Sequence, residues 1–184
     1  IIGIDAFASC KDLTGVSIPD GVTTIDWGAF EGCNNLSSVT IPESVTSIDY
    51  YAFAWCSSLT GIKLPSGISS IEGGTFQGCS SLTTIDIPDN VTRIGYSAFE
   101  DCSNLETINI PSGVTEIVKN AFNGTPYLTN QLQCNDFFII NGILLDISEN
   151  VSGDVTIPDN VTKIGDEVFK ESTWEDSDHK LTSI

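Results

Sequence analysis

Six cysteines offer this chain its widest choice of chemistry, and five of them share one spacing. They recur every 23 residues, at Cys10, Cys33, Cys56, Cys79 and Cys102. Two cysteines can form a disulfide, and four that converge can hold zinc. Side chains stacked in parallel at about 4.8 Å neither converge nor bring their Cβ atoms close enough for a disulfide. We therefore predict buried free thiols that are unreactive in the folded protein, with Cys134 outside the series.

The single histidine, His179, is the other candidate for catalysis. It ends the acidic run that begins at Glu175. A Ser–His or Cys–His system needs the histidine beside a positioned nucleophile and an orienting group, and no pattern marks either. The run also lacks the spacing of a calcium-binding loop. We interpret it as a solvated loop, and we predict no enzymatic activity, no cofactor and no bound metal.

Aromatic residues outside the predicted core positions are the binding candidates. They are Trp27, Tyr50, Tyr51, Trp55 and Tyr96. Large rings with a polar edge are common anchors of protein and sugar binding sites. Acidic residues nearby, at Asp26, Asp49 and Glu72, would favour a basic or hydroxyl-rich partner. Alternatively, these rings pack along the turns, and the site lies on the strand face around Lys63 and Asp86.

These residues belong to a repeat of 23 residues that runs through most of the chain. Its clearest markers are Phe7, Phe30, Phe53, Phe76, Phe99 and Phe122. Self-similarity at one short period indicates a solenoid, in which each unit buries its apolar face against its neighbours. The phenylalanines should therefore form one buried column beside the cysteines. One layer of side chains would fill each coil, so we expect a ligand to bind a surface patch and not a deep pocket.

Each unit predicts a turn, a strand and a second extended stretch. Residues 27–33 fit a short turn or a single helical turn. Alternation then places Val39 and Ile41 on one face and Thr40 on the other. Pro42 ends the strand, because proline cannot donate to a ladder. The expected fold class is thus α/β, a β-rich solenoid with short helical turns and about eight coils.

The repeat register breaks after Phe122. Two β-prone runs flank Asn141-Gly142, which predicts a β-hairpin insertion at about 131–150. A second insertion covers roughly 174–179. We interpret residues 1–184 as a single domain and as a fragment of a longer array, because the chain begins inside a repeat.

The repeat resembles the BspA-like leucine-rich repeats. The shared pattern is Ile-x-x-x-Ala-Phe-x-x-Cys-x-x-Leu-x-x-[Val/Ile]-x-Ile-Pro, which recurs from Ile2 through Leu128 and returns at residues 157–169. The resemblance implies a leucine-rich-repeat solenoid on an extracellular, cell-surface or secreted protein, and a role in adhesion. It implies as partner a host or neighbouring-cell surface protein, with a glycan as the other ligand class. It carries no catalytic motif.

Charge and hydropathy exclude two partner classes. The chain carries 7 basic and 25 acidic residues, for a net charge of −18. Such a field repels nucleic acid and anionic membrane surfaces. No apolar run approaches the roughly 20 residues of a membrane-spanning helix. Two functions remain: a non-catalytic interaction or adhesion module, and a structural spacer that displays another domain.

Overall fold

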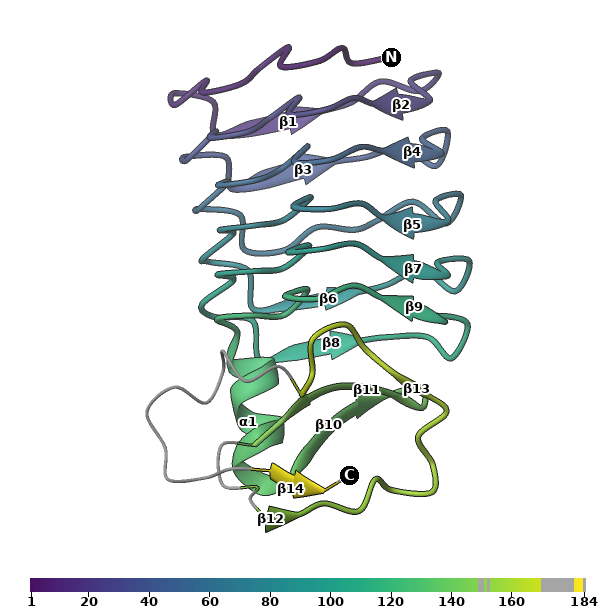
Figure 1. Cartoon of the computed structure of the whole chain (residues 1–184). Helices are drawn as coiled ribbons and strands as arrows, with labels where there is room; N and C mark the ends of the chain where they lie inside the picture. The colour runs from purple at the N-terminus through teal and green to yellow at the C-terminus, as the bar shows by residue number, and fades with distance from the viewer. Residues whose placement is uncertain (149–150, 152, 170–180, 184) are drawn as a thin grey trace.

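The chain forms an elongated stack of coils, along which two columns of short parallel strands run (Figure 1). This computed structural model describes residues 1–148, 151, 153–169 and 181–183. The first column contains β1 (Gly15–Ser17), β3 (Ser38–Thr40), β6 (Thr84–Asp86) and β8 (Thr107–Asn109). The second contains β2 (Thr24–Ile25), β4 (Ser47–Ile48), β5 (Ser70–Ile71), β7 (Arg93–Ile94) and β9 (Glu116–Ile117).

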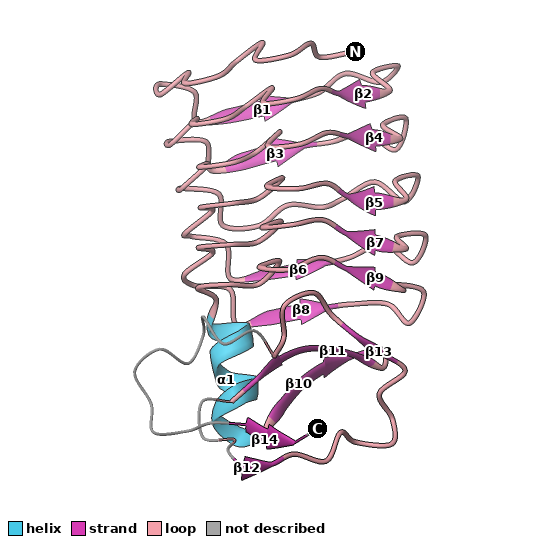
Figure 2. Ribbon diagram, in the orientation of Figure 1, coloured by secondary structure: helices cyan, strands magenta, loops and turns pink. Residues whose placement is uncertain are grey.

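Turns and loops make up most of each coil (Figure 2). Residues 27–33 form turns without a helix, and β3 is followed by buried Ile41 while Thr40 faces solvent, as the alternation predicts. Paired strands are 23 residues apart, so Val16 lies opposite Val39. The predicted β-rich solenoid of 23-residue repeats is confirmed, although the regular stack has about six turns and not the eight we expected.

The phenylalanine column is the centre of the core. The six rings stack nearly parallel, with centroids 5.1–5.9 Å apart and interplanar angles of 2–10°. Phe30, Phe53, Phe76 and Phe99 are fully buried, as predicted. Phe7, at the first coil, is 38% exposed because no preceding coil covers it among the residues described.

The cysteine column adds hydrogen bonds to its apolar packing. Four thiols donate to the main-chain carbonyl of a phenylalanine in the preceding coil, at distances of 3.0–3.3 Å; they belong to Cys33, Cys56, Cys79 and Cys102. All six cysteines are free, as predicted. Cys10 is exposed, however, so the expectation that the whole column is buried is wrong at its first member.

A different architecture follows the last regular coil. Helix α1 (Pro126–Cys134) is capped by Thr125, whose side chain accepts a hydrogen bond from the Leu128 N–H. A hairpin follows, formed by antiparallel β10 (Phe137–Ile140) and β11 (Ile143–Ile147). The parallel ladders resume with β13 (Lys163–Ile164) on β11 and with β12 (Gly153–Asp154) on β14 (Leu181–Ser183). The segment that we assigned to the hairpin insertion therefore begins in α1, which we did not predict.

Candidate binding surface

The five aromatic candidates lie on the turns that also contain the phenylalanines of the column. Trp27, Trp55 and Tyr96 are 41%, 44% and 38% exposed, whereas Tyr50 and Tyr51 are half-buried. None of them belongs to the buried core. Their side chains therefore offer apolar surface to the solvent on several neighbouring coils.

Four of these rings form one connected group, which we call the four-ring cluster: Trp27, Tyr50, Tyr51 and Tyr96. Tyr51 meets Trp27 edge-on at 5.9 Å and Tyr96 edge-on at 6.2 Å between ring centroids. Tyr50 lies 6.4 Å from Tyr96. The hydroxyls of Tyr51 and Tyr96 are 2.6 Å apart and share a hydrogen bond. Trp55 makes no ring contact with the cluster among the described residues, so the structure brings four of the five candidates together.

Two consecutive glycines in the intervening coil allow the cluster to span it. A Cβ atom at Gly73 would overlap the Tyr96 ring, and one at Gly74 would overlap the Tyr51 ring. Both rings therefore lie against main chain that carries no side chain, which brings Tyr51 and Tyr96 together across 45 residues of sequence. Trp55 lies over Gly78 in the same way.

Tyr51 and Trp55 adopt a backbone conformation that bulky residues rarely accept. Their φ angles are +57° and +59°. The other repeats have positive φ at the same two places, where the residues are glycine or small and polar. They are Asp5, Gly28, Gly74, Ser97 and Asn120 at Tyr51's place, and Ser9, Gly32, Gly78, Asp101 and Gly124 at Trp55's place. For an L-residue the left-handed region costs roughly 1–2 kcal/mol. The positive φ is therefore a property of the repeat, and what distinguishes Tyr51 and Trp55 is that bulky rings replace the glycine or small polar residue found there in other coils.

Hydrogen bonding and charge raise the pKa of two tyrosines of the cluster, Tyr50 and Tyr51. The hydrogen bond with Tyr96, reinforced by burial, raises the pKa of Tyr51 to about 12. The negative charge of Glu72 raises the pKa of Tyr50. Both hydroxyls thus keep their protons to a higher pH than an ordinary tyrosine does, and can donate or accept hydrogen bonds.

The acidic neighbours that we expected to define the partner already have local partners. Carboxylate oxygens of Asp26 and Asp49 accept hydrogen bonds from the main-chain N–H groups of Trp27 and Tyr50. Glu72 pairs with Arg93 at 3.1 Å, and Arg93 also pairs with Glu116. These carboxylates hold the turns and still contribute negative charge beside the rings.

The strand face, our alternative site, contains an interruption that the sequence pattern did not reveal. Residues 61–63 occupy the place between β3 and β6 but do not form a strand, and both columns are split near this point. An open hollow of about 700 Å³ lies there, and both Lys63 and Asp86 line it. Because this hollow is open, the expectation that a ligand binds a surface patch and not a deep pocket stays a prediction.

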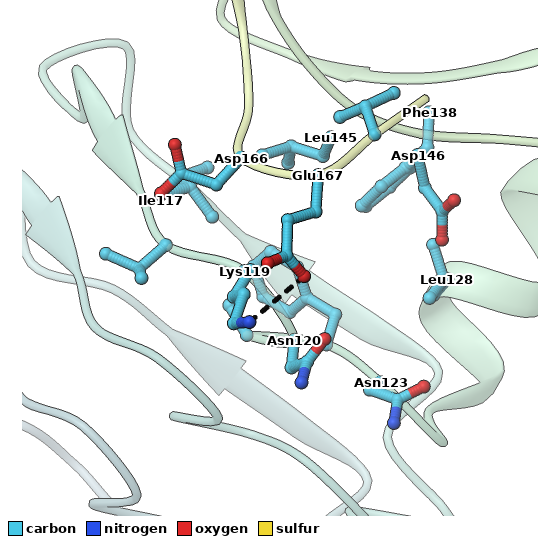
Figure 3. Close-up of a pocket in the computed structure, with 14 residues that line it drawn as sticks. Ile117, Lys119, Asn120, Asn123, Leu128, Phe138, Leu145, Asp146, Asp166 and Glu167 are labelled. Carbon is cyan, nitrogen blue, oxygen red and sulfur yellow. Dashed lines mark hydrogen bonds and ion pairs between the residues drawn. The ribbon is translucent and has the colours of Figure 1, made fainter. Parts of the chain in front are cut away.

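A smaller cavity of about 140 Å³ lies where the last regular coil meets the hairpin (Figure 3). Leu128, Phe138 and Leu145 contribute apolar walls, and the ion pair of Lys119 with Glu167 at 3.1 Å lies among its lining groups. It exists because the hairpin does not repeat the side-chain layer of the coil it covers. Its size suits a few water molecules.

The remaining chemical candidates find no support in the described part of the chain. No group of three or more His, Cys, Asp or Glu side chains there is arranged to hold a metal ion. Nor does any helix in those ranges have the length and apolar character needed to cross a bilayer. His179 and the second insertion lie outside the described residues.

Comparison with known families decides the affiliation of this chain. Residues 1–129 and 148–179 match the family described as BspA type Leucine rich repeat region, in 6 copies. The chain belongs to the BspA-type leucine-rich repeat family. The BspA-type match thus covers the regular stack and resumes after the hairpin, which itself lies outside the match. Among curated proteins, none matches this BspA-type chain.

Solved structures of bacterial leucine-rich repeat proteins are similar to this chain. A leucine-rich repeat protein of Treponema pallidum is 31% identical, over 63% of this chain and 61% of its own, with a TM-score of 0.59. A leucine-rich cell surface protein of Faecalibacterium prausnitzii is 42% identical, over 62% of this chain and 30% of its own, with a TM-score of 0.60. This chain therefore spans less than two thirds of either protein.

Proposed function

We propose that this BspA-type chain is a non-catalytic interaction and adhesion module of a cell-surface or secreted bacterial protein. Its partner is a host or neighbouring-cell surface protein, with a glycan as the other ligand class. The four-ring cluster is the contact surface. The observation that carries this proposal is the placement of Tyr51, a large ring held at positive φ, in contact with Trp27 and Tyr96.

Physical chemistry favours such a cluster as an anchor. Trp and Tyr rings bury much area while losing few rotamers, and they dominate measured hot spots. Here the rings hold one another, so part of the ordering cost of binding has already been met before the partner arrives. The similarity to a leucine-rich cell surface protein of Faecalibacterium prausnitzii supports the surface location.

A structural spacer is the second candidate, and the same observations favour it in part. The cluster spans neighbouring coils beside the interrupted ladder, so its rings also help to hold the stack together. In a spacer they would serve packing alone. Binding and stability must therefore be measured on the same variants.

The test is a protein and glycan array probed with the whole chain and with the Trp27→Ala/Tyr50→Ala double variant. Loss of a hot-spot ring costs about 2 kcal/mol or more, so we expect binding to fall at least about 30-fold. Trp55→Ala is the matched comparison, because it removes an equally exposed indole outside the cluster. Its affinity should stay within about threefold of the unaltered chain.

Thermal melting of the same proteins separates the two functions. An adhesion surface predicts lost binding with a melting temperature that changes little. Normal binding with early melting would assign the rings to packing, and equal losses in the Trp55→Ala variant would remove the cluster's special role.

A further inference from the structure

One coil of the stack lacks the main-chain bonds that join its neighbours on the strand side. In the coils before and after it, the N–H of Ile18 donates to Thr40 and that of Ile87 donates to Asn109, each at 3.0 Å. Residues 60–64, which lie in the equivalent position, take part in no main-chain hydrogen bond of the described structure. Their N–H and C=O groups are therefore free to bond to a ligand.

The hollow on the strand face coincides with this segment. Residues of three successive turns line it: Glu43 from the first, residues 62–64 and Ser66 from the second, and residues 86–90 from the third. Ile87 and Leu64 are buried beneath its polar rim. Open space, apolar floor and unused main-chain groups thus occur together at one place.

The charges of the hollow favour a cation. Lys63 is its only basic lining residue among those described, and it pairs with Glu43 at 3.2 Å. The Glu43 carboxylate also accepts hydrogen bonds from the N–H and the hydroxyl of Ser66. Asp86 and Asp89 have no ion pair within the described ranges, so the hollow keeps a net negative charge.

We propose that this hollow binds an extended basic segment of a partner protein. The main chain of the segment bonds to groups of residues 62–64, which line the hollow, and a lysine or arginine side chain reaches Asp86 and Asp89. The pair of Lys63 with Glu43 does not oppose this, because both side chains are largely exposed and such pairs contribute little to stability. The site is separate from the four-ring cluster and does not depend on it.

The test uses a short synthetic peptide of alternating lysine and threonine, with alternating glutamate and threonine as the negative control. Asp86→Asn/Asp89→Asn should weaken binding of the lysine peptide at least about tenfold, because a charge-assisted contact is lost. The matched control is Asp12→Asn/Asp20→Asn, which removes the same charge and includes Asp20, the residue at Asp89's place in an earlier coil. It should change binding less than about threefold.

Two further measurements locate the peptide. Hydrogen exchange at the amides of Ile62 and Leu64 should slow when the peptide binds, because those groups gain bonds. The Trp27→Ala/Tyr50→Ala variant should bind the peptide normally. Four outcomes would each overturn the proposal. The two aspartate variants could lose the same peptide affinity, or the lysine peptide could fail to bind at all. Hydrogen exchange at Ile62 and Leu64 could stay unchanged, or peptide binding could require the four-ring cluster.

Discussion

The regular stack and the segment that follows it use the same residue types in opposite ways. Within the stack, Phe99 lies parallel to Phe122, at an interplanar angle of 3°. On its other side Phe122 meets Phe138 at 90° and Tyr127 at 69°. A ring in the stack therefore meets its own copy, whereas a ring at the end meets residues with no counterpart elsewhere. Repetition determines contacts in the first region, and individual side chains determine them in the second.

One substitution marks the border between the two regions. The thiol of Cys102 donates across the coils to the carbonyl of Phe76. At the same place in the next repeat, the hydroxyl of Thr125 donates to Phe122 in its own coil, at 2.6 Å. The same oxygen accepts a hydrogen bond from Leu128 N–H and so caps α1. Exchange of a thiol for a hydroxyl thus accompanies the end of stacking and the start of the helix.

The largest expected effect compares the two aromatic environments. Phe76→Ala should lower the free energy of unfolding by about 3–5 kcal/mol, because stacked coils cannot collapse into the cavity. Phe138→Ala should cost a similar amount but should expose only amides of the region after residue 125 to hydrogen exchange. Urea unfolding and exchange measured by NMR would check both. If Phe138→Ala also opens the stack, the two regions form one cooperative unit and the distinction fails.

A smaller effect tests how the hairpin is attached to the stack. Asn141 lies at φ +50°, and its side-chain amide donates to the carbonyls of Pro111 and Val114 at 2.9 and 3.0 Å. Asn141→Ala should cost about 2 kcal/mol through left-handed strain and lost hydrogen bonds. Asn135→Ala is the control, because it removes an exposed amide that bonds only within the end of α1. Similar costs for the two variants would show that Asn141 does not anchor the hairpin.

The smallest effect concerns the thiols, which are buried only in the stack. Burial raises the pKa of Cys56 and Cys102 to about 12, above an ordinary value of 9.0. A raised pKa means that the folded state favours the neutral thiol. The free energy of unfolding is therefore at its full value below pH 9, and it falls as the pH rises from about 9 to 12. At pH 10 each thiol should reduce stability by about 1 kcal/mol.

Urea unfolding at several pH values measures this loss, and the Cys56→Val/Cys102→Val variant should lose less over the same range. At neutral pH a thiol reagent should label Cys10 and Cys134, the exposed cysteines, in the native protein. All six should react after denaturation. Rapid native labelling of Cys79 would contradict the buried column.

The sequence predicted the features that depend on the 23-residue period, because residues that recur at one spacing must occupy equivalent places in a solenoid. The phenylalanine column, the free thiols and the aromatic residues outside the core follow from that rule. The exposure of Cys10 does not, because burial at the first coil depends on a neighbour. Helix α1 left a signal that we did not use: Thr125 before Pro126 is a capping residue followed by a proline suited to the first helical turn.

The sites were harder to predict than the fold. Contact between Tyr51 and Tyr96 requires Gly73-Gly74 in the coil between them, and this pair of glycines was visible in the sequence. The unbonded segment at residues 60–64 left a fainter trace. Gly61 replaces the threonine of the next two repeats, but Gly15 occupies the same place inside a regular strand. Whether main-chain hydrogen bonds form between two coils depends on how those coils pack, and the repeat period does not specify this.

The interrupted ladder also has a mechanical consequence for a solenoid loaded along its axis. Neither β4 with β5 nor residues 60–64 with β3 form ladder bonds, so the main-chain bonds of this interface lie mainly on the turn side, where Tyr51 and Phe53 donate to Gly73 and Thr75. Bonds concentrated on one edge break one after another, at lower force than bonds that share the load. Under tension we expect the stack to part here first, like a zipper, and single-molecule pulling would show it as an early extension ahead of the remaining coils.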